Sequence, residues 1–381
     1  MKIVTIIGAR PQFIKAASVS RAIKEFNRGQ SRASKRIQEV LVHTGQHYDY
    51  LMDRVFFEEL GLPKCDYHLG VGSGSHGKQT GMMLEQIEAV LQKEKPALVM
   101  VYGDTNSTLA GALAAVKLHV PVAHVEAVLR SYDRAMPEEI NRLLTDHVSK
   151  WLFCPTDEAV ENLAKEGIRN RSQGRWVKNV GDVMHDSILY YLKIAETRSI
   201  ILQDLGLLTP NASHLTSYYL ATLHRAENTD NPKRLKTILR AFDEISKKAS
   251  VILPLHPRTK KMMKTFSLHP KGKNVKVIEP ASYLNMLVLE KHATAILTDS
   301  GGIQKEAYWL GVPCITLRDV TEWGYTVKEG WNTIAGWKTE SIVQAVQRVP
   351  DTKKRRSRRR EGRPTASERI VHLLVKDLGN L

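Results

Sequence analysis

The chain has 381 residues, of which 42% are hydrophobic and 25% are charged. These proportions are ordinary for a globular protein, and they exclude a disordered or fibrous chain. No apolar run reaches 18 residues without a charge, which excludes a membrane-spanning helix. The length predicts two domains, because a single compact core rarely grows to this size.

The net charge of +16 raises the question of nucleic-acid binding, but much of this charge is local. Residues 351–363 carry a net charge of +6 and residues 21–36 carry +5, which together account for +11. Neither stretch interleaves aromatic residues for base stacking, and neither lies in a known nucleic-acid-binding pattern. We therefore expect no specific nucleic-acid partner.

The N-terminal segment MKIVTIIGARPQ has a short apolar run that ends in a turn, not in a cleavage site. We expect no signal peptide and a cytoplasmic location. The three cysteines, Cys65, Cys154 and Cys314, form no CxxC pair, which favours buried apolar side chains over zinc or redox chemistry.

Short apolar runs rich in β-branched residues recur along the chain, with helix-compatible segments between them. In the first half these runs are KIVTIIG (2–8), EVLVHTG (39–45), ALVMVYGD (97–104), VPVAHVE (120–126) and KWLFCPT (150–156). In the second half they are YYLATLH (218–224), ASVILPLH (249–256), VKVIEP (275–280), AILTDSGG (295–302) and VPCITLRD (312–319). This alternation predicts an α/β protein with two parallel sheets.

The boundary between the two halves falls near residues 180–200. We expect one α/β domain at 1–185 and a second at 186–364. The last segment, within 365–381, has helical apolar spacing and is expected to pack back on the first domain. In open parallel sheets ligands bind beyond the carboxyl ends of the strands, so polar residues that follow strands are the candidates for function.

In the first half, Gly8 permits a turn and Pro11 suits the start of a helix, so Arg10 and Lys15 are candidate phosphate ligands. Asp104 and Glu126 each follow a strand and could share one site. A further acidic pair, Glu138-Glu139, follows a proline, where a role at a helix start competes with catalysis.

In the second half, Ser300-Gly301-Gly302 turns from a strand into a helix, a pattern that can bind a diphosphate through backbone amides, with Glu306 positioned for ribose hydroxyls. The loop is neither GxxxxGK nor GxGxxG, which argues against ATP hydrolysis and nicotinamide binding. His224-Arg225 and His256 follow two more strands. His43 and His47 in HTGQH flank a glycine after a strand, so we expect no metal site.

Eight motifs together resemble the non-hydrolysing UDP-N-acetylglucosamine 2-epimerases. They are, in family order, GARPQFIK, HTGQHYD, YGDTNSTLAGALAA, HVEAVLRS, PEEINRLLTD, LHRAEN, LPLHPRT and LTDSGGIQKEA. The resemblance covers nearly the whole chain. It implies a GT-B-like fold with two Rossmann-like domains and parallel sheets facing a central cleft. The N-terminal domain at 1–185 would be catalytic, and the C-terminal domain at 186–364 would bind UDP.

The resemblance also implies roles for individual residues. Asp104, Glu126 and Glu138 match the catalytic carboxylates, with Asp104 the candidate base. Residues that match positions around the UDP-sugar are Arg10, Lys15, Arg130, His224, Arg225, Glu227, Asn228, His256, Tyr283, Ser300, Gly301, Gly302 and Glu306. His224 is also a candidate for catalysis. The implied reaction removes the C2 proton, expels UDP to leave a 2-acetamidoglucal, and returns the proton to the opposite face as UDP adds again, without a cofactor.

Several positions depart from the family pattern. Val128 stands where glycine is usual, and Val320, Gly324 and Tyr325 replace residues of an RDETEWVE pattern, so the choice of sugar is open. Gln46 and Gln79 resemble a second, activating site for UDP-N-acetylglucosamine, but Lys78 stands where an arginine is common. The family suggests a homodimer.

Three alternative functions remain open on sequence grounds. A hydrolysing epimerase would release free N-acetylmannosamine and UDP, and a GT-B glycosyltransferase would use the first-domain carboxylates for an acceptor. A non-enzymatic sugar-nucleotide-binding protein would bind UDP without turnover. Exchange and trapping measurements on the sugar C2 atom distinguish these alternatives.

Overall fold

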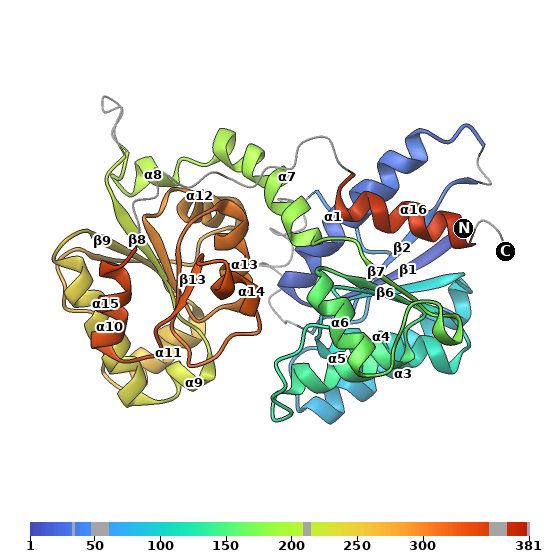
Figure 1. The fold of residues 1–381 in the computed structure, drawn as a ribbon, viewed down its shortest axis with the longest axis horizontal. Helices are drawn as coiled ribbons and strands as arrows, with labels where there is room; N and C mark the ends of the chain where they lie inside the picture. The colour runs from blue at the N-terminus through green and yellow to red at the C-terminus, as the bar shows by residue number, and fades with distance from the viewer. Residues whose placement is uncertain (33–34, 47–60, 209–214, 350–363, 379–381) are drawn as a thin grey trace. The chain divides into compact units, whose positions relative to one another are not determined.

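The computed structural model describes residues 1–32, 35–46, 61–208, 215–349 and 364–378. The chain folds into two compact units, Met1–Ser187 with Gly362–Leu381, and Ile188–Glu361 (Figure 1). Each unit contains one parallel sheet with helices on both faces, which confirms the predicted α/β class. The boundary between the two units lies within helix α7 (Val183–Arg198), since Ser187 belongs to the first unit and Ile188 to the second. His47 and the basic stretch 351–363 lie outside the described residues.

The sheet of the first unit has the strand order β3-β2-β1-β4-β5-β6-β7 among the described residues. Its strands are β1 (Lys2–Ile7), β2 (Gln38–His43), β3 (Tyr67–His68), β4 (Leu98–Tyr102), β5 (Val122–Val125), β6 (Trp151–Cys154) and β7 (Trp176–Asn179). Every residue of β4, β5 and β6 is buried, because a parallel sheet covered on both faces exposes neither side to water. These strands therefore appear in the sequence as unbroken apolar runs.

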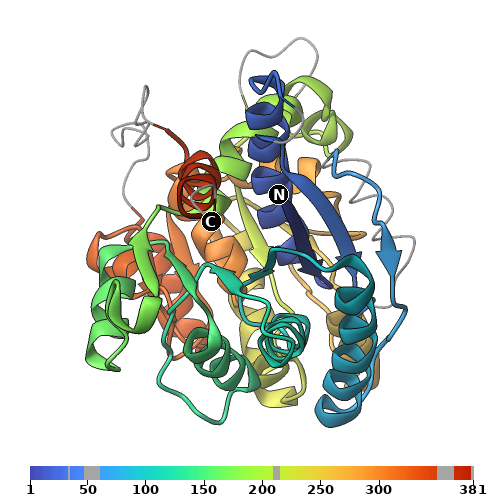
Figure 2. The same cartoon turned by 90° about the vertical axis from the view of Figure 1, so that its right-hand side faces the viewer.

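Two groups of helices cover the sheet of the first unit (Figures 1 and 2). One face carries α3 (His76–Glu94), α4 (Asn106–Lys117), α5 (Pro137–Val148) and α6 (Asp157–Lys165). The other face carries α1 (Arg10–Arg28), the first part of α7 and the C-terminal helix α16 (Ala366–Leu378), which lies beside α1. The short helix η2 (Ser172–Gly174) precedes β7.

The sheet of the second unit has the order β10-β9-β8-β11-β12-β13 among the described residues. Its strands are β8 (Tyr218–Thr222), β9 (Ser250–Pro254), β10 (Val275–Ile278), β11 (Ala295–Thr298), β12 (Cys314–Thr316) and β13 (Asn332–Ile334). Helices α10 (Pro232–Ser246), α11 (Pro257–Thr265) and α15 (Thr339–Gln347) share one hydrophobic core against the sheet. The remaining helices are α8 (Ile201–Asp204), α9 (Ala226–Thr229), α12 (Tyr283–His292), α13 (Gly301–Leu310) and α14 (Gly324–Lys328).

Each sheet has one point where the strand order reverses direction. This point lies between β1 and β4 in the first unit and between β8 and β11 in the second. Crossover helices leave such a point on opposite faces of the sheet, so the loops there diverge and leave room for a ligand. Asp104 follows β4, whereas His224 and Ser300 follow β8 and β11. The candidate residues of both units therefore lie where the topology favours binding.

None of the helices in the described part of the chain combines the length and the apolar character needed to cross a bilayer.

Asp186 anchors the start of α16. Its carboxylate accepts hydrogen bonds from the backbone N–H of Ala366 at 3.3 Å, and from the N–H and Oγ of Ser367 at 2.8 Å each. Burial raises the pKa of Asp186 to about 6, against the opposing effect of these donors. The fold thus favours the protonated carboxyl. The contribution of this protonated group to the free energy of unfolding is present near pH 4 and is lost as the pH rises through about 6.

We expect Asp186→Asn to change the pH dependence of stability. A shift of about two pKa units corresponds to about 3 kcal/mol. As the pH rises from about 4 to about 7, the variant should therefore gain about that much unfolding free energy relative to the wild type. Urea denaturation at several pH values measures the difference, with the exposed Asp157→Asn as the control. A difference that stays constant with pH would contradict the prediction.

Candidate active site

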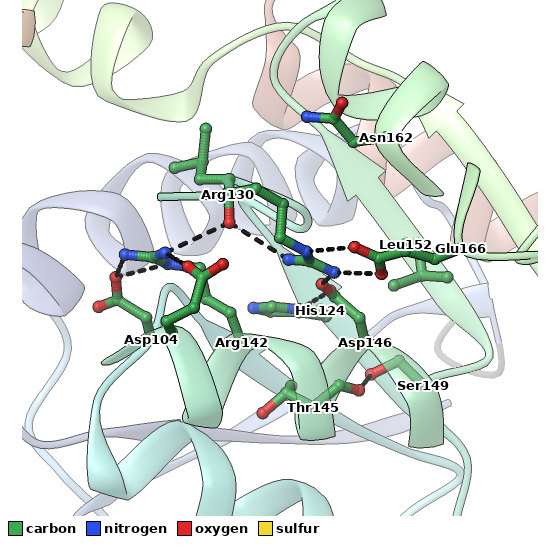
Figure 3. Close-up of polar contacts among 12 residues, drawn as sticks. Asp104, His124, Arg130, Arg142, Thr145, Asp146, Ser149, Leu152, Asn162 and Glu166 are labelled. Carbon is green, nitrogen blue, oxygen red and sulfur yellow. Dashed lines mark hydrogen bonds and ion pairs between the residues drawn. The ribbon is translucent and has the colours of Figure 1, made fainter. Parts of the chain in front are cut away.

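Asp104 lies directly after β4, with its carboxylate held by Arg142 of α5 (Figure 3). The Arg142 Nε and Nη2 atoms lie 3.0 and 2.9 Å from Asp104 Oδ2, and the side chain of Asn141 donates to the Asp104 carbonyl at 3.0 Å. About a third of the Asp104 side chain remains exposed, whereas Arg142 is buried. A carboxylate fixed by a fork of donors and still open on one side is suited to proton transfer.

Glu126 follows the neighbouring strand β5 and pairs with Lys15 of α1. Both side chains are buried, so each charge depends on the other for compensation. The pair lies beside Gly103, since a side-chain carbon at Gly103 would be 3.1 Å from Lys15 Nζ and 3.6 Å from Glu126 Oε1. The structure thus brings Lys15, Glu126 and the residue before Asp104 together, whereas the sequence offered Lys15 only as a candidate phosphate ligand.

The acidic pair at the start of α5 divides into two roles. Glu139 is buried and accepts hydrogen bonds from the backbone N–H groups of Ser131 and Tyr132 and pairs with Arg142. This gives Glu139 a supporting role in the loop that precedes α5. Glu138 is only partly buried in the same helical turn, and it stays the candidate for catalysis.

The turn after β5 is strained. Glu126 and Val128 have φ angles of 66° and 64°, in the left-handed region that side chains rarely adopt. For a β-branched residue this conformation costs on the order of 1–2 kcal/mol. The Val128 side chain is fully buried against Leu152, Cys154 and Leu163, so packing holds the turn in place. Strain held by packing is typical of turns that orient a functional group, here Glu126.

Ser300 caps α13 in the second unit, with its Oγ accepting from the backbone N–H of Ile303. A side-chain carbon at Gly301 would be 2.5 Å from Glu322 Oε1 and 3.2 Å from Trp323 Nε1, so a larger residue there would require the Glu322 side chain to move. At Gly302 the nearest such contact is Ser300 Oγ, at 3.8 Å. The start of α13 therefore offers backbone amides and a helix dipole for an anion, as the sequence predicts for a diphosphate.

Asp299 organises the loops around this helix start. It is fully buried and accepts from the backbone N–H groups of His224 and Arg225 at 3.0 Å each, and from Asn228 Nδ2 at 3.2 Å. Burial raises the pKa of Asp299, and these donors oppose that rise. The ring of His224 lies 5.2 Å from the ring of His256. The predicted residues thus lie on loops at the carboxyl ends of three adjacent strands, β9, β8 and β11.

Glu227 belongs to a second cluster of charges, centred on Arg318. The Arg318 Nε and Nη1 atoms donate to Glu227 Oε1 at 2.8 Å and to Glu322 Oε2 at 3.0 Å. Near this cluster, Val320 is exposed, and the Tyr325 ring packs at 5.2 Å from Tyr308.

The remaining predicted residues lie in varied surroundings. Arg10 is partly buried at the start of α1, Tyr283 is buried with its ring 5.8 Å from Tyr191, and Glu306 is buried in α13. Arg130 is buried and donates to Glu166 and Asp146, which favours a supporting role over direct ligand binding.

Two of the three residues of the suggested second site contact each other, because Gln79 Nε2 donates to the Gln46 carbonyl at 3.4 Å. Gln46 accepts from the N–H and Oγ of Ser107 at 3.0 and 2.6 Å. Gln79 accepts from Asn106 Nδ2 at 2.8 Å, whereas Lys78 is exposed. The second, activating site stays a prediction.

The sequence did not single out Arg142, Asp299 or Arg318. Arg142 lies within PEEINRLLTD, and Asp299 and Arg318 each follow a strand, which was an available signal. Within the described part of the chain, no three or more His, Cys, Asp or Glu residues are grouped so as to hold a metal ion.

Comparison with known proteins connects these features to a family. The family model described as UDP-N-acetylglucosamine 2-epimerase matches residues 30–375. A UDP-N-acetylglucosamine 2-epimerase homolog from Methanococcus maripaludis is 52% identical over 91% of this chain and 92% of its own. The chain belongs to the UDP-N-acetylglucosamine 2-epimerase family.

A solved member of this family has the same fold over its full length. The Methanocaldococcus jannaschii UDP-GlcNAc 2-epimerase, crystallised in complex with UDP-GlcNAc and UDP, has a TM-score of 0.86 at 46% identity. The match covers 99% of this chain and 100% of that one. The glycosyltransferase SnogD from Streptomyces nogalater is similar in fold alone, with a TM-score of 0.54 at 15% identity, in keeping with a GT-B-like architecture.

Another epimerase relative acts on a different sugar. The UDP-2,3-diacetamido-2,3-dideoxy-D-glucuronate 2-epimerase of Pseudomonas aeruginosa is 48% identical over 99% of this chain and 100% of its own. Both this relative and the Methanocaldococcus jannaschii protein are named as 2-epimerases.

The strain at Val128 predicts an unusual order of stability among epimerase variants. Both Val128→Ala and Val128→Gly lose buried methyl groups, but only glycine adopts the left-handed conformation without strain. At an ordinary position the glycine variant would be about 1 kcal/mol less stable than the alanine variant. We expect the glycine variant to be at least as stable here, as measured by urea denaturation. An alanine variant more stable by about 1 kcal/mol would show that the turn is unstrained.

Proposed function

We propose that the protein interconverts UDP-N-acetylglucosamine and UDP-N-acetylmannosamine by eliminating and re-adding UDP. The observation that carries the proposal is the pair of carboxylates at the ends of adjacent strands, Asp104 with Arg142 and Glu126 with Lys15, in a chain of this family. Inversion of a weakly acidic carbon needs a positioned base and a separate proton donor. The two pairs offer these from different strands.

In the proposed reaction Asp104 removes the C2 proton. The electron pair of the C2–H bond forms the C1–C2 double bond as the bond between C1 and the UDP oxygen breaks, which leaves 2-acetamidoglucal and UDP. In the return step the UDP oxygen attacks C1, and C2 takes a proton on the opposite face. The Lys15–Glu126 pair and Glu138 are the proposed proton carriers for that step.

The second unit is proposed to hold UDP. The amides at the start of α13, the Arg225 guanidinium and the His224 imidazole would stabilise the charge that grows on the leaving diphosphate. Arg10, Glu227, Asn228, His256, Tyr283 and Glu306 are proposed as further binding residues. We also propose the homodimer and the cytoplasmic location that the sequence predicts.

Deuterium exchange tests the reaction. Incubation with UDP-N-acetylglucosamine in D2O should yield UDP-N-acetylmannosamine that carries deuterium at C2, detected by NMR and mass spectrometry. Release of free N-acetylmannosamine would indicate the hydrolysing reaction instead. Binding of UDP without any C2 exchange would exclude both epimerase mechanisms.

Replacement of the proposed base should separate chemistry from binding. Asp104→Asn keeps the side-chain shape but cannot accept the proton, so C2 exchange should fall at least about 100-fold. The Kd for UDP, measured by calorimetry, should stay within about twofold, because α13 and its loops are unchanged. Asp157→Asn is the matched control on an exposed carboxylate. Exchange at the wild-type rate in Asp104→Asn would exclude Asp104 as the base.

The diacetamido-glucuronate is the second candidate substrate, favoured by the 48% identity to the Pseudomonas aeruginosa enzyme. It differs from N-acetylglucosamine by a carboxylate at C6 and an amide at C3. We expect kcat/KM for UDP-N-acetylglucosamine to exceed that for the glucuronate by at least about tenfold, a difference of about 1.4 kcal/mol in transition-state binding. The opposite ratio would reassign the substrate without changing the reaction.

A further inference from the structure

His124 lies on β5, two residues before Glu126 in the chain, and its side chain is fully buried. Its two ring nitrogens each lie within hydrogen-bond distance of an oxygen atom. Figure 3 shows the contact of one of them with Asp146. Nδ1 is 2.8 Å from Asp146 Oδ1, and Nε2 is 2.7 Å from the carbonyl oxygen of Gly103. Gly103 is the residue immediately before Asp104.

These distances restrict the protonation state of His124. A carbonyl oxygen cannot donate, so the proton of the Gly103 contact must be on Nε2. A neutral imidazole would then present a bare Nδ1 to a carboxylate oxygen at 2.8 Å. A proton on Asp146 could fill that contact, but Asp146 Oδ2 accepts from Arg130 Nη2 at 2.8 Å, which favours the carboxylate form. The arrangement is satisfied when His124 carries protons on both nitrogens.

The charges around His124 support the same conclusion. Glu166 holds Arg130 through two hydrogen bonds, from Nε at 2.7 Å and from Nη2 at 2.8 Å, and Arg130 in turn holds Asp146. Burial lowers the pKa of Arg130, but the hydrogen bonds and charges of Glu166 and Asp146 outweigh burial and raise it above its ordinary value. Arg130 and Asp146 are buried, whereas about a quarter of the Glu166 side chain is exposed, so water also compensates the Glu166 charge. With an imidazolium the four groups carry two negative and two positive charges, an arrangement in which each charge has an opposite neighbour.

The Gly103 contact links this chain of charges to Asp104. The N–H of Gly103 donates to the Val125 carbonyl at 3.0 Å, and its carbonyl accepts from His124, so both sides of the glycine are tied to β5. The carbonyl of Gly103 and the N–H of Asp104 belong to one rigid peptide plane. A donor on that carbonyl therefore fixes the plane from which the Asp104 side chain leaves the backbone. A positively charged donor makes the stronger bond.

We propose that His124 is a buried imidazolium, held by the chain Asp146–Arg130–Glu166, and that it positions Asp104 for proton abstraction through the Gly103 carbonyl. The positioning role rests on the function proposed for Asp104, whereas the protonation of His124 does not. His124 touches no reacting atom in this scheme and is a positioning residue. Arg130 belongs to the same chain, which explains why its donors point inward.

NMR of the full-length protein with 15N-labelled histidine tests the protonation directly. At about pH 8 an exposed histidine is neutral and has one protonated ring nitrogen. His124, assigned by the signal that disappears in His124→Gln, should show both ring nitrogens protonated in the same sample. A bare nitrogen on His124 under these conditions would overturn the proposal, whatever the enzyme's activity.

Asp146→Asn tests the source of the charge. The asparagine keeps an oxygen for Arg130 but removes the negative charge next to His124. The spectrum of this variant at about pH 8 should show a single protonated nitrogen on His124. Two protonated nitrogens in the variant would mean that Asp146 does not hold the imidazolium, and would contradict the proposed chain.

Two replacements of His124 test positioning. A glutamine amide can reach the Gly103 carbonyl as a donor, but leucine cannot. We expect His124→Leu to lower kcat for C2 exchange about 100-fold, the scale of a misplaced catalytic group, with KM and the Kd for UDP within about twofold. His124→Gln should recover most of this loss, and the exposed His147→Gln should be unaffected.

The outcomes of these measurements separate the two proposals. Equal rates for His124→Leu and His124→Gln, or a loss that appears only in KM, would contradict positioning through Gly103. Failure of the wild type to exchange C2 would refute the proposed reaction and leave the NMR result standing on its own. If His124→Leu does not fold, the spectra of the wild type and of Asp146→Asn still decide whether the imidazolium exists.

Discussion

The need to compensate buried carboxylates determines how the candidate residues of each unit are arranged. A carboxylate removed from water is unstable unless donors or cations surround it. Asp299 is surrounded by backbone and side-chain N–H groups, Glu126 by the Lys15 ammonium, and Asp146 by Arg130 and His124. Because the partners come from other segments of the chain than the carboxylates, satisfying these charges also fixes the positions of the loops that carry them.

The parallel sheets supply the second part of the arrangement. Their carboxyl ends meet at one edge, so short loops after β4 and β5 bring Asp104 and Glu126 near each other. Such short loops require unusual backbone conformations. Gly103 adopts a φ of 63° without strain, whereas Glu126 and Val128 adopt similar angles only because the surrounding packing holds them. The active-site turn therefore depends on the hydrophobic cluster under α6 as much as on its own residues.

Much of the fold follows from local patterns. The buried strands appear as apolar runs, since neither face of a parallel sheet meets water, and the polar residues after them mark the loops at the ligand edge. Asp104, Glu126 and Ser300 were recognisable for that reason. Arg142 and Asp146 were not, because they lie inside an amphipathic helix, where the same spacing also describes residues that simply face the sheet. Arg142 lies 38 residues along the chain from its partner Asp104, and Asp146 lies 22 residues from His124.

The sequence by itself determined the α/β class, the family and the carboxylates that follow the strands, because these depend on patterns within a few residues or on motifs in a fixed order. Only the tertiary structure decided which cation meets which carboxylate. In the folded protein Lys15 pairs with Glu126, and Asp104 pairs with Arg142. Arg130 pairs with both Asp146 and Glu166. Such pairings depend on which helix packs over which strand end, and no local pattern records the distance between two side chains that meet only after folding.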